Sequence, residues 1–256
     1  MIASLAMYEL AGMAPANDRL WALIRDGLRS HGIAAPAALT RGEDAYWPAW
    51  TAPDLVLSQT CGFPYRARLH DKVALIGTPD YGLPGCPPGH YCSVFVARRD
   101  DPRRTLAEFD GTALAYNEPM SQSGWAAPQT HASSLGLHFP AGLQTGGHRL
   151  SAAAVASGQA DLAALDALTW ALLCERGGDT VALREVARTA PTPGLPLIAA
   201  EGADVEATFA AVADANAALS PDDRETLHLK GIVRIAPAAY RAVPTPPPPA
   251  QNDDAT

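Results

Sequence analysis

The sequence predicts an α/β fold with mostly parallel sheets. Short apolar segments typical of strands alternate with helical segments along the chain, as expected for successive βαβ units. Several strands end in turns rich in polar and small residues. In parallel α/β sheets the carboxyl ends of the strands gather the ligand site. We therefore expect these turns to converge: Ser58–Gly62, Thr78–Gly82, Ser121–Gly124 and Thr145–His148.

The first hundred residues contain one clear helix among several strands. Apolar residues recur at helical spacing between Leu20 and Leu28, Asn17 or Asp18 supplies an N-cap, and Gly32 ends the helix. Strands are expected at residues 2–7, 34–41, 55–57, 73–76 and 92–97.

The rest of the chain continues the alternation. Expected in order are a short helix at 106–109, a strand at 113–116, a helix start interrupted by Pro128, a helix at 151–157, a strand at 162–165 and a helix at 167–175. Two strands follow around the turn "APTPGLP", then an amphipathic helix in "DVEATFAAVADANAAL" and another opened by Ser220. The proline-rich tail, residues 244–256, is expected to be disordered.

The composition of the chain limits the classes of protein to which it can belong. The chain has 256 residues, 48% of them hydrophobic and 18% charged, which is a globular composition. Its net charge of −8 gives no electrostatic case for binding nucleic acid or an anionic membrane. No apolar run is long enough to span a bilayer, and no basic residue precedes Arg19 as a secretory leader would require. These features favour a cytoplasmic chain, or one given without its leader.

Four cysteines match no zinc spacing, and we expect neither a metal nor a cofactor. Free buried thiols are the favoured interpretation. One disulfide among Cys61, Cys86 and Cys92 remains the alternative, and it would indicate an oxidising compartment.

The segment Ser121-Gln122-Ser123-Gly124 is a candidate anion site. It follows an expected strand and precedes a helical segment, so free N–H groups and the helix dipole favour negative charge there. Ser121 and Ser123 add hydroxyl donors, and Gly124 permits close approach to the backbone. The alternative is a simple N-capping turn, which draws on the same residue types.

Two further residues stand at comparable positions. His148 follows a Gly-Gly pair at a strand-to-helix turn and could donate to an anion, or could simply cap a helix. Asp166 ends a strand and could accept a hydrogen bond from a ligand, although an N-cap role is the stronger interpretation. Serine, histidine and aspartate together suit a hydrolase triad by type alone, but no nucleophile elbow or other catalytic motif is present, so we expect no enzyme.

Two blocks of sequence together resemble a known family. "YCSVFVARRDDPRRTLAEFDGTALAYNEPMSQSGW" and "TGGHRLSAAAVASGQADLAALD" resemble, in order and spacing, segments of the phosphate, phosphite and phosphonate substrate-binding proteins of ABC transporters. The resemblance covers roughly residues 1–240 and is densest from Tyr91 to Trp170. It implies the two-lobed type 2 periplasmic binding protein fold.

The family's architecture implies that residues 1–92 plus 190–243 form one lobe and residues 93–189 the other, with a small oxyanion clamped in the cleft. Hinges would lie near Cys92-Ser93 and Ala190–Gly194. Carried over from the family, the ligand contacts in the second lobe are Ser121, Gln122, Ser123, Gly124, His148 and Asp166, and Tyr91 matches an aromatic residue of the cleft. Tyr8, Gln59 and Thr60 would face the cleft from the first lobe.

The resemblance also implies a function. It predicts a monomeric solute-binding protein that feeds an ABC-transporter permease from the periplasm and performs no chemistry. The missing leader keeps a cytoplasmic location open. A cytosolic small-molecule sensor, or a thiamine-precursor-type protein on the same fold, is the alternative.

Overall fold

A computed structural model of the chain describes residues 1–249. It divides into two compact units, and the chain passes between them three times. Unit 1 comprises Met1–His90 and Pro193–Ala242; unit 2 comprises Tyr91–Thr192 and the segment from Val243 onward. The boundaries expected from the sequence were 92/93, 189/190 and 243/244. Two of the crossing segments, β4 (His90–Tyr91) and β10 (Thr192–Pro193), pair as a two-stranded ladder.

Unit 1 is a five-stranded sheet between two helical layers. The strand order is β1-β2-β11-β3-β12. Its strands are β1 (Ile2–Ser4), β2 (Leu55–Gln59), β3 (Val73–Asp80), β11 (Leu197–Ala200) and β12 (Gly231–Val233). Its helices and turns are η1 (Ala6–Tyr8), α1 (Ala14–Ser30), η2 (Glu43–Ala45), α2 (Trp47–Trp50), α3 (Gly62–Pro64), η3 (Tyr65–Leu69), α7 (Val205–Ala218), α8 (Pro221–Thr226) and α9 (Pro237–Arg241).

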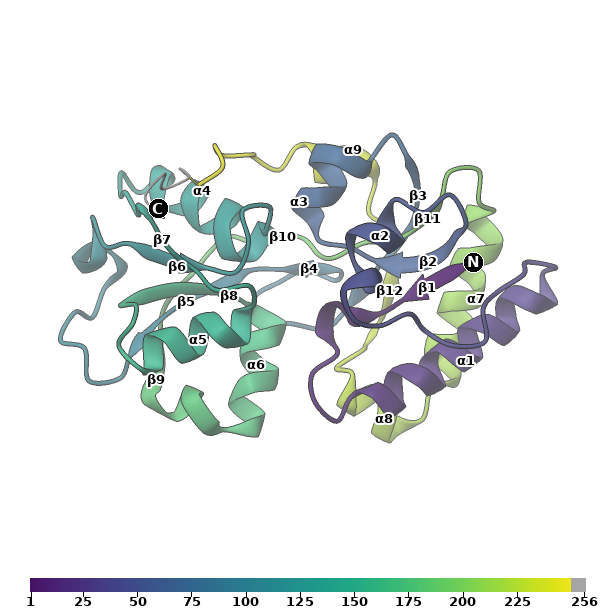
Figure 1. Ribbon diagram of the computed structural model, residues 1–256, viewed down its shortest axis with the longest axis horizontal. Coiled ribbons are helices and arrows are strands. Elements are labelled where there is room, and N and C mark those ends of the chain that lie inside the picture. Colours follow the sequence, from purple (N-terminus) through teal and green to yellow (C-terminus); the bar gives the residue numbers. More distant parts are fainter. Residues whose placement is uncertain (250–256) are drawn as a thin grey trace. The chain divides into compact units, whose positions relative to one another are not determined.

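The two faces of the unit 1 sheet are covered differently. Helices α1 and α7 run beside each other and α7 covers β3 and β12 (Figure 1). On the other face α2, η3 and α9 bring large side chains together in one apolar cluster: Trp50, Leu55, Tyr65, Leu69, Ile198 and Tyr240. Burying this apolar surface stabilises the unit.

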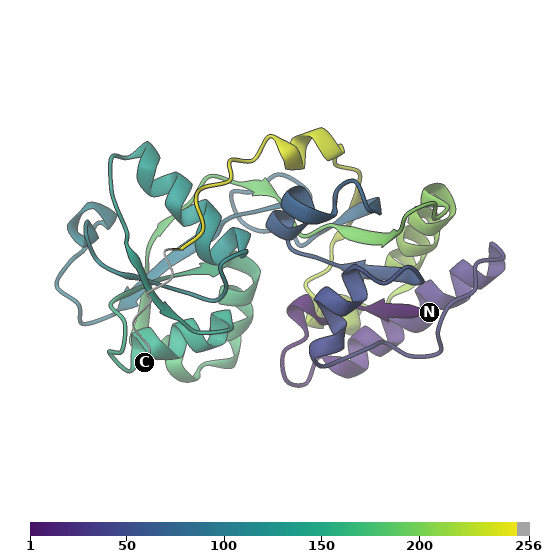
Figure 2. The ribbon, with the colours of Figure 1, turned by 45° about the horizontal axis from the view of Figure 1, so that its top comes forward.

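Unit 2 repeats the design with the strand order β7-β6-β8-β5-β9. Its strands are β5 (Ser93–Arg98), β6 (Leu114–Tyr116), β7 (Ala141–Gln144), β8 (Leu162–Asp166) and β9 (Leu183–Arg188). Its helices and turns are η4 (Leu106–Phe109), η5 (Gln122–Ala126), α4 (Ala127–Ser134), α5 (His148–Ala156), α6 (Ala167–Arg176) and η6 (Gly178–Ala182). Helices α5 and α6 share one face of the sheet, whereas α4 and η4 cover the other (Figure 2).

The expectation of mostly parallel sheets was wrong, because both sheets are mixed. Strands β1 and β2 are parallel, as are β6, β7 and β8, but β5, β11 and β12 run antiparallel to their neighbours. The register explains this direction. Ser93 begins β5 opposite Asp166, the end of β8, and Leu197 begins β11 opposite Gln59, the end of β2. A strand that starts at the edge where its neighbour ends must run the opposite way.

Three local expectations need correction. Residues 34–41 form no strand; α1 side chains hold this segment instead, because Trp21, Arg25 and Arg29 donate to its carbonyls. Helix α1 begins at Ala14 with proline in its first turn, earlier than the expected cap at Asn17 or Asp18. The first strand ends at Ser4 and gives way to a 3₁₀ turn.

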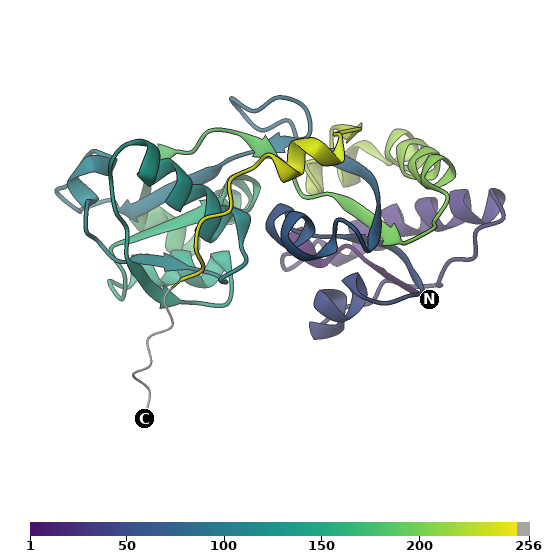
Figure 3. The same ribbon diagram turned by 90° about the horizontal axis from the view of Figure 1, so that it is seen from above.

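The C-terminal segment is described as far as residue 249. It leaves α9 and continues along unit 2 (Figure 3), where Pro247 O accepts a hydrogen bond from Trp125 Nε1 at 2.9 Å. The rest of the tail that the sequence marks as disordered, residues 250–256, lies outside the described residues.

Candidate functional site

The serine loop of unit 2 connects β6 to a helix and is capped by its own first serine. Ser121 Oγ accepts the Gly124 N–H at 2.9 Å, as an N-cap does. The Ser121 carbonyl accepts from Trp125 N and Ala126 N. The N–H group of Ser123 belongs to the first turn, whose donors a helix cannot satisfy internally. Ser121, Gln122 and Ser123 are all buried.

The sequence led us to expect a helix interrupted at Pro128. The structure shows instead that the helical segment after the loop continues through Pro128. Proline lacks an N–H, and its ring clashes with the carbonyl four residues earlier in a regular α-helix. The chain avoids this clash with a wider π-helical turn, η5, in which Ala127 N–H donates to Gln122 O. Pro128 then lies in the first turn of α4, where it is tolerated.

Gly124 packs closely against the side-chain amide of Asn117. A Cβ built on Gly124 would lie 1.9 Å from Asn117 Oδ1 and 3.2 Å from Ser121 Oγ. A side chain at position 124 would therefore require the Asn117 amide to move. Asn117 Oδ1 is itself buried and has no partner among the described residues.

His148 is the first residue of α5, and its turn is tied to the end of β6. Thr145 N–H donates to Tyr116 O and Gly146 N–H to Asn117 O, both at 2.9 Å. These bonds place His148 against the serine loop, where its Nε2 lies 2.9 Å from Ser123 Oγ. The turn Thr145–His148 was expected to offer a ligand site, and the structure joins its histidine to Ser123.

The imidazole of His148 is neutral near pH 7. The residue keeps some exposed surface, but its Nδ1 is buried and has no partner in the described part of the chain. Burial disfavours the charged ring and lowers the pKa of His148 to about 4. A neutral ring contributes one donor and one acceptor, rather than a charge.

Asp166 caps a helix, which is the interpretation that the sequence favoured. Its Oδ1 accepts from Leu168 N at 2.8 Å and Thr169 N at 3.0 Å at the start of α6. It ends β8, next to β6, and so lies at the same sheet edge as the two loops. Ser93, opposite Asp166, has a buried Oγ without a partner in residues 1–249. Tyr91 is buried in β4.

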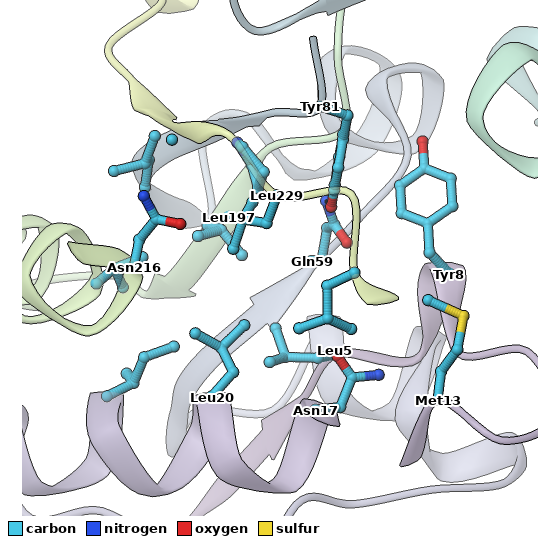
Figure 4. A pocket seen from close by; sticks show the side chains of 16 residues that line it. Leu5, Tyr8, Met13, Asn17, Leu20, Gln59, Tyr81, Leu197, Asn216 and Leu229 are labelled. Carbon is cyan, nitrogen blue, oxygen red and sulfur yellow. The ribbon is translucent and has the colours of Figure 1, made fainter. Parts of the chain in front are cut away.

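The expected contacts of unit 1 also come together at one place. Gln59 ends β2, and its Nε2 donates to Tyr81 OH at 3.1 Å and to Leu195 O at 3.2 Å. Tyr8 packs edge-on against the Tyr81 ring, with centroids 5.1 Å apart. Thr60 Oγ1 is buried and has no partner in the described chain. Tyr8, Gln59 and Tyr81 also border a cavity inside this unit (Figure 4).

The two units use the same local design after a strand. Ser58-Gln59-Thr60 lies at the end of β2 and Ser121-Gln122-Ser123 follows β6. Each leads into a proline-containing helical segment with a π-helical turn, η3 or η5. The repeated Ser-Gln pattern is a signal that could have linked the two turns directly from the sequence.

Sequence reasoning missed two residues, Tyr81 and Asn117. Tyr81 lies in a polar turn already singled out after β3, and Asn117 directly follows β6. Both residues follow the end of a strand, and this position is the feature of the sequence from which they could have been predicted as site residues.

Within the described residues no cluster of histidine, cysteine and carboxylate side chains could hold a metal, and the four cysteines are free thiols. In the same range no helix is both long and apolar enough to cross a membrane. All hydrogen-bond partners that residues 1–249 provide to Ser121, Ser123 and His148 are neutral groups. The unit 2 site can therefore offer hydrogen bonds to an oxyanion without a bulk positive charge.

Comparison with known proteins identifies what the chain is similar to. A family model described as "ABC transporter, phosphonate, periplasmic substrate-binding protein" matches residues 55–242, more than half of the chain. No curated protein sequence matches this chain.

Several solved structures share the fold at low sequence identity. PhnD1 from Prochlorococcus marinus, in complex with methylphosphonate, is 16% identical with a TM-score of 0.71, over 94% of each chain. XAC2383 from Xanthomonas citri, bound to ATP, is 18% identical with a TM-score of 0.67, over 95% of this chain and 94% of that one. A binding protein component of an ABC phosphonate transporter from Pseudomonas aeruginosa is 15% identical with a TM-score of 0.65, over 91% and 80%. At these identities the match shows the two-lobed α/β fold.

Proposed function

Because the chain belongs to the family of periplasmic substrate-binding proteins of ABC phosphonate transporters, we propose that it binds a small phosphorus oxyanion through the serine loop and His148 of unit 2. The observation that carries this proposal is the bond between Ser123 and His148 at the start of a helix. One proton lies in this bond, so the pair offers one further side-chain donor beside the first turn of the helix, at one edge of the sheet.

Hydrogen bonds can supply the required affinity. Bonds to a charged oxyanion contribute roughly 1.5–3 kcal/mol each, and micromolar binding needs about 8 kcal/mol in total. The Ser123–His148 pair keeps one side-chain donor beyond the bond between them, and the Ser123 N–H is a second. These two bonds contribute roughly 3–6 kcal/mol, and the other proposed contacts supply the rest. Ser121 Oγ is engaged as the cap, so its contribution is to hold the loop in shape.

The remaining family positions are proposed as ligand contacts on the resemblance alone: Tyr8, Gln59, Thr60, Tyr91 and Asp166. Among them Asp166 acts first as a helix cap, as its two backbone partners indicate. We place no catalytic role on any of these residues, and phosphorus NMR of the ligand after long incubation with the protein should show it unchanged.

Isothermal titration calorimetry with phosphate, phosphite, methylphosphonate and ATP tests the ligand class directly. We expect saturable binding of at least one of the three small oxyanions, and weaker or no binding of ATP. An absence of heat with all four, on cooperatively folded protein, would reject the proposal.

Ser123→Ala should weaken binding of the identified ligand at least tenfold, because it removes a donor and the partner of His148. Ser134→Ala is the matched control, since Ser134 is an exposed residue at the far end of the same helical segment and bonds only locally to His131 O. Equal affinities for the two variants would show that the serine loop is a structural turn with no role in ligand binding.

The family also implies delivery to a permease from the periplasm. Uptake of the ligand by cells, measured with and without the gene for this chain, tests the transporter. Fractionation of cells that express the full gene tests the location.

A further inference from the structure

The start of the proline-rich tail, which the sequence marked as disordered, is docked on unit 2. Residues 243–249 belong to this unit and form no helix or strand (Figure 3). Val243, Pro246 and Pro249 are partly or fully buried, whereas the residues between them are exposed. A spacing of three is the repeat of a polyproline II helix. One face of such a helix therefore rests on the unit.

The segment and the side chain that receives it have complementary hydrogen-bonding groups. Residues 246–249 are four consecutive prolines, so they offer carbonyl acceptors and no N–H donor. The indole of Trp125 is a donor only, and its Nε1 donates to Pro247 O at 2.9 Å. Proline also fixes φ, so the segment loses little conformational entropy when it docks. Because one neutral hydrogen bond and few buried side chains hold it, we expect the docking to be reversible.

Trp125 links this segment to both halves of the candidate site. Its backbone N–H donates to Ser121 O at 3.2 Å, within the serine loop. Its ring packs against that of Tyr116, with centroids 5.2 Å apart. The carbonyl of Tyr116 accepts from Thr145 N–H in the turn that leads to His148. A contact that holds the Trp125 ring in place therefore also supports the serine loop and the His148 turn.

The start of the segment is fixed independently of Trp125. Tyr240 in α9, three residues earlier, is 1% exposed, and its OH lies 2.6 Å from Thr78 Oγ1. Pro247 follows only seven residues later in the chain. Docking is therefore an intramolecular event, which proceeds at a high effective concentration of the segment.

We infer that residues 243–249 act as a strap that docks on Trp125 and positions the serine loop. When the strap detaches, the backbone of residues 122–126 opens more often. One further step rests on the function proposed above: a looser loop binds the oxyanion more weakly, because binding must then also order the loop. The docking itself does not depend on a ligand.

Hydrogen exchange of the Trp125 and Ala126 amides, followed by NMR on the full chain, measures the opening of the loop, since both amides donate to Ser121 O. Pro249→Asp places a charge on the docked face, where burial disfavours it. It should speed exchange of both amides about two- to tenfold, the factor that one neutral hydrogen bond provides, and shift the indole N–H resonance of Trp125. Pro248→Asp is the matched control at the exposed neighbouring position, and it should change neither.

Removal of the donor tests the same contact from the other side. Trp125→Phe keeps a ring against Tyr116 but loses the indole N–H, and exchange of the Ala126 amide should rise by the same factor. Trp21→Phe is the matched control, because Trp21 Nε1 donates to Pro36 O at 3.3 Å in unit 1. It should leave the Ala126 amide unchanged. Thermal unfolding of every variant checks that it is folded.

Unchanged exchange and an unchanged Trp125 indole resonance in Pro249→Asp, or equal changes in Pro249→Asp and Pro248→Asp, would overturn the strap. Calorimetry with phosphate, phosphite and methylphosphonate tests the further step. Pro249→Asp should weaken the oxyanion that binds about two- to tenfold relative to Pro248→Asp, and equal affinities would reject the link to ligand binding. If none of the three binds the wild-type protein, the proposed function fails, and the exchange data still decide whether the strap positions the loop.

Discussion

At the scale of single residues, Gly124 shows how closely the serine loop is packed. The Asn117 amide occupies the space beside its Cα, and Asn117 lies on the strand end to which the His148 turn is also tied. A change at position 124 therefore disturbs both halves of the candidate site.

Gly124→Ala should lower the free energy of unfolding by about 1–3 kcal/mol, because the new methyl group overlaps Asn117. Gly147→Ala is the matched control: it lies in the neighbouring turn at an extended φ of −175°, and nothing lies within 4 Å of its added Cβ. Denaturant unfolding of both variants measures the difference. Equal losses would show that the packing of Asn117 over position 124 is unimportant.

His148 should make stability depend on pH. Its pKa falls from 6.5 to about 4 on folding because the ring is buried. Between these values the unfolded chain binds a proton that the folded chain does not, so stability is full above about pH 6.5 and declines toward pH 4. His148→Gln should reduce this decline. The six other histidines are common to both proteins, so the difference between their curves isolates His148, and identical curves would contradict the assignment.

At the scale of elements, the ends of neighbouring strands set the geometry of unit 2. Strands β6, β7 and β8 are parallel, and each leads directly into one of the serine loop, the His148 turn and the Asp166 cap. The π-helical turn at η5 lets the helix after the serine loop continue despite Pro128. The site is therefore mounted on regular elements rather than on long loops.

Asp166→Ala should destabilise the protein by about 1–2 kcal/mol, since it leaves the buried N–H groups of Leu168 and Thr169 without an acceptor. Asp166→Asn keeps a capping oxygen and should recover most of this loss. Thermal or denaturant unfolding provides the measurement. If the Asn variant were as unstable as the Ala variant, the carboxylate charge rather than the cap would be the important feature.

At the scale of the whole molecule, the charge balance distinguishes this site from a cluster of cations. The chain carries a net charge of −8, and Ser123 and His148, the side chains at the centre of the proposed site, are neutral at pH 7. The long-range field therefore opposes an approaching anion, and only short-range hydrogen bonds capture it.

Affinity for the oxyanion should stay the same or rise slightly as ionic strength increases from about 0.02 to 0.2 M, because salt screens the unfavourable long-range field. Potassium gluconate is the salt of choice, since it adds no small halide that could compete for the same donors. Calorimetry at each concentration measures the trend. A steep loss of affinity with salt would reveal a cationic site elsewhere.

Much of the architecture was predictable because periodicity and turn chemistry are local properties. Strands such as β2, β5 and β8, the helix α7 and the strand-end turns all follow from short sequence patterns, and the family resemblance correctly indicated the two-lobed fold. The prediction of a strand at residues 34–41 was wrong because side chains of α1, rather than a neighbouring strand, hold this segment.

By itself, the sequence determined the alternation of strands and helices, the family, and the residue types at the strand ends. Only the tertiary structure decided that β5 and β11 run antiparallel, that Ser123 meets His148, and that burial keeps His148 neutral. The physical reason is that direction, burial and hydrogen-bond satisfaction depend on residues far apart in the chain. No local pattern carries that information.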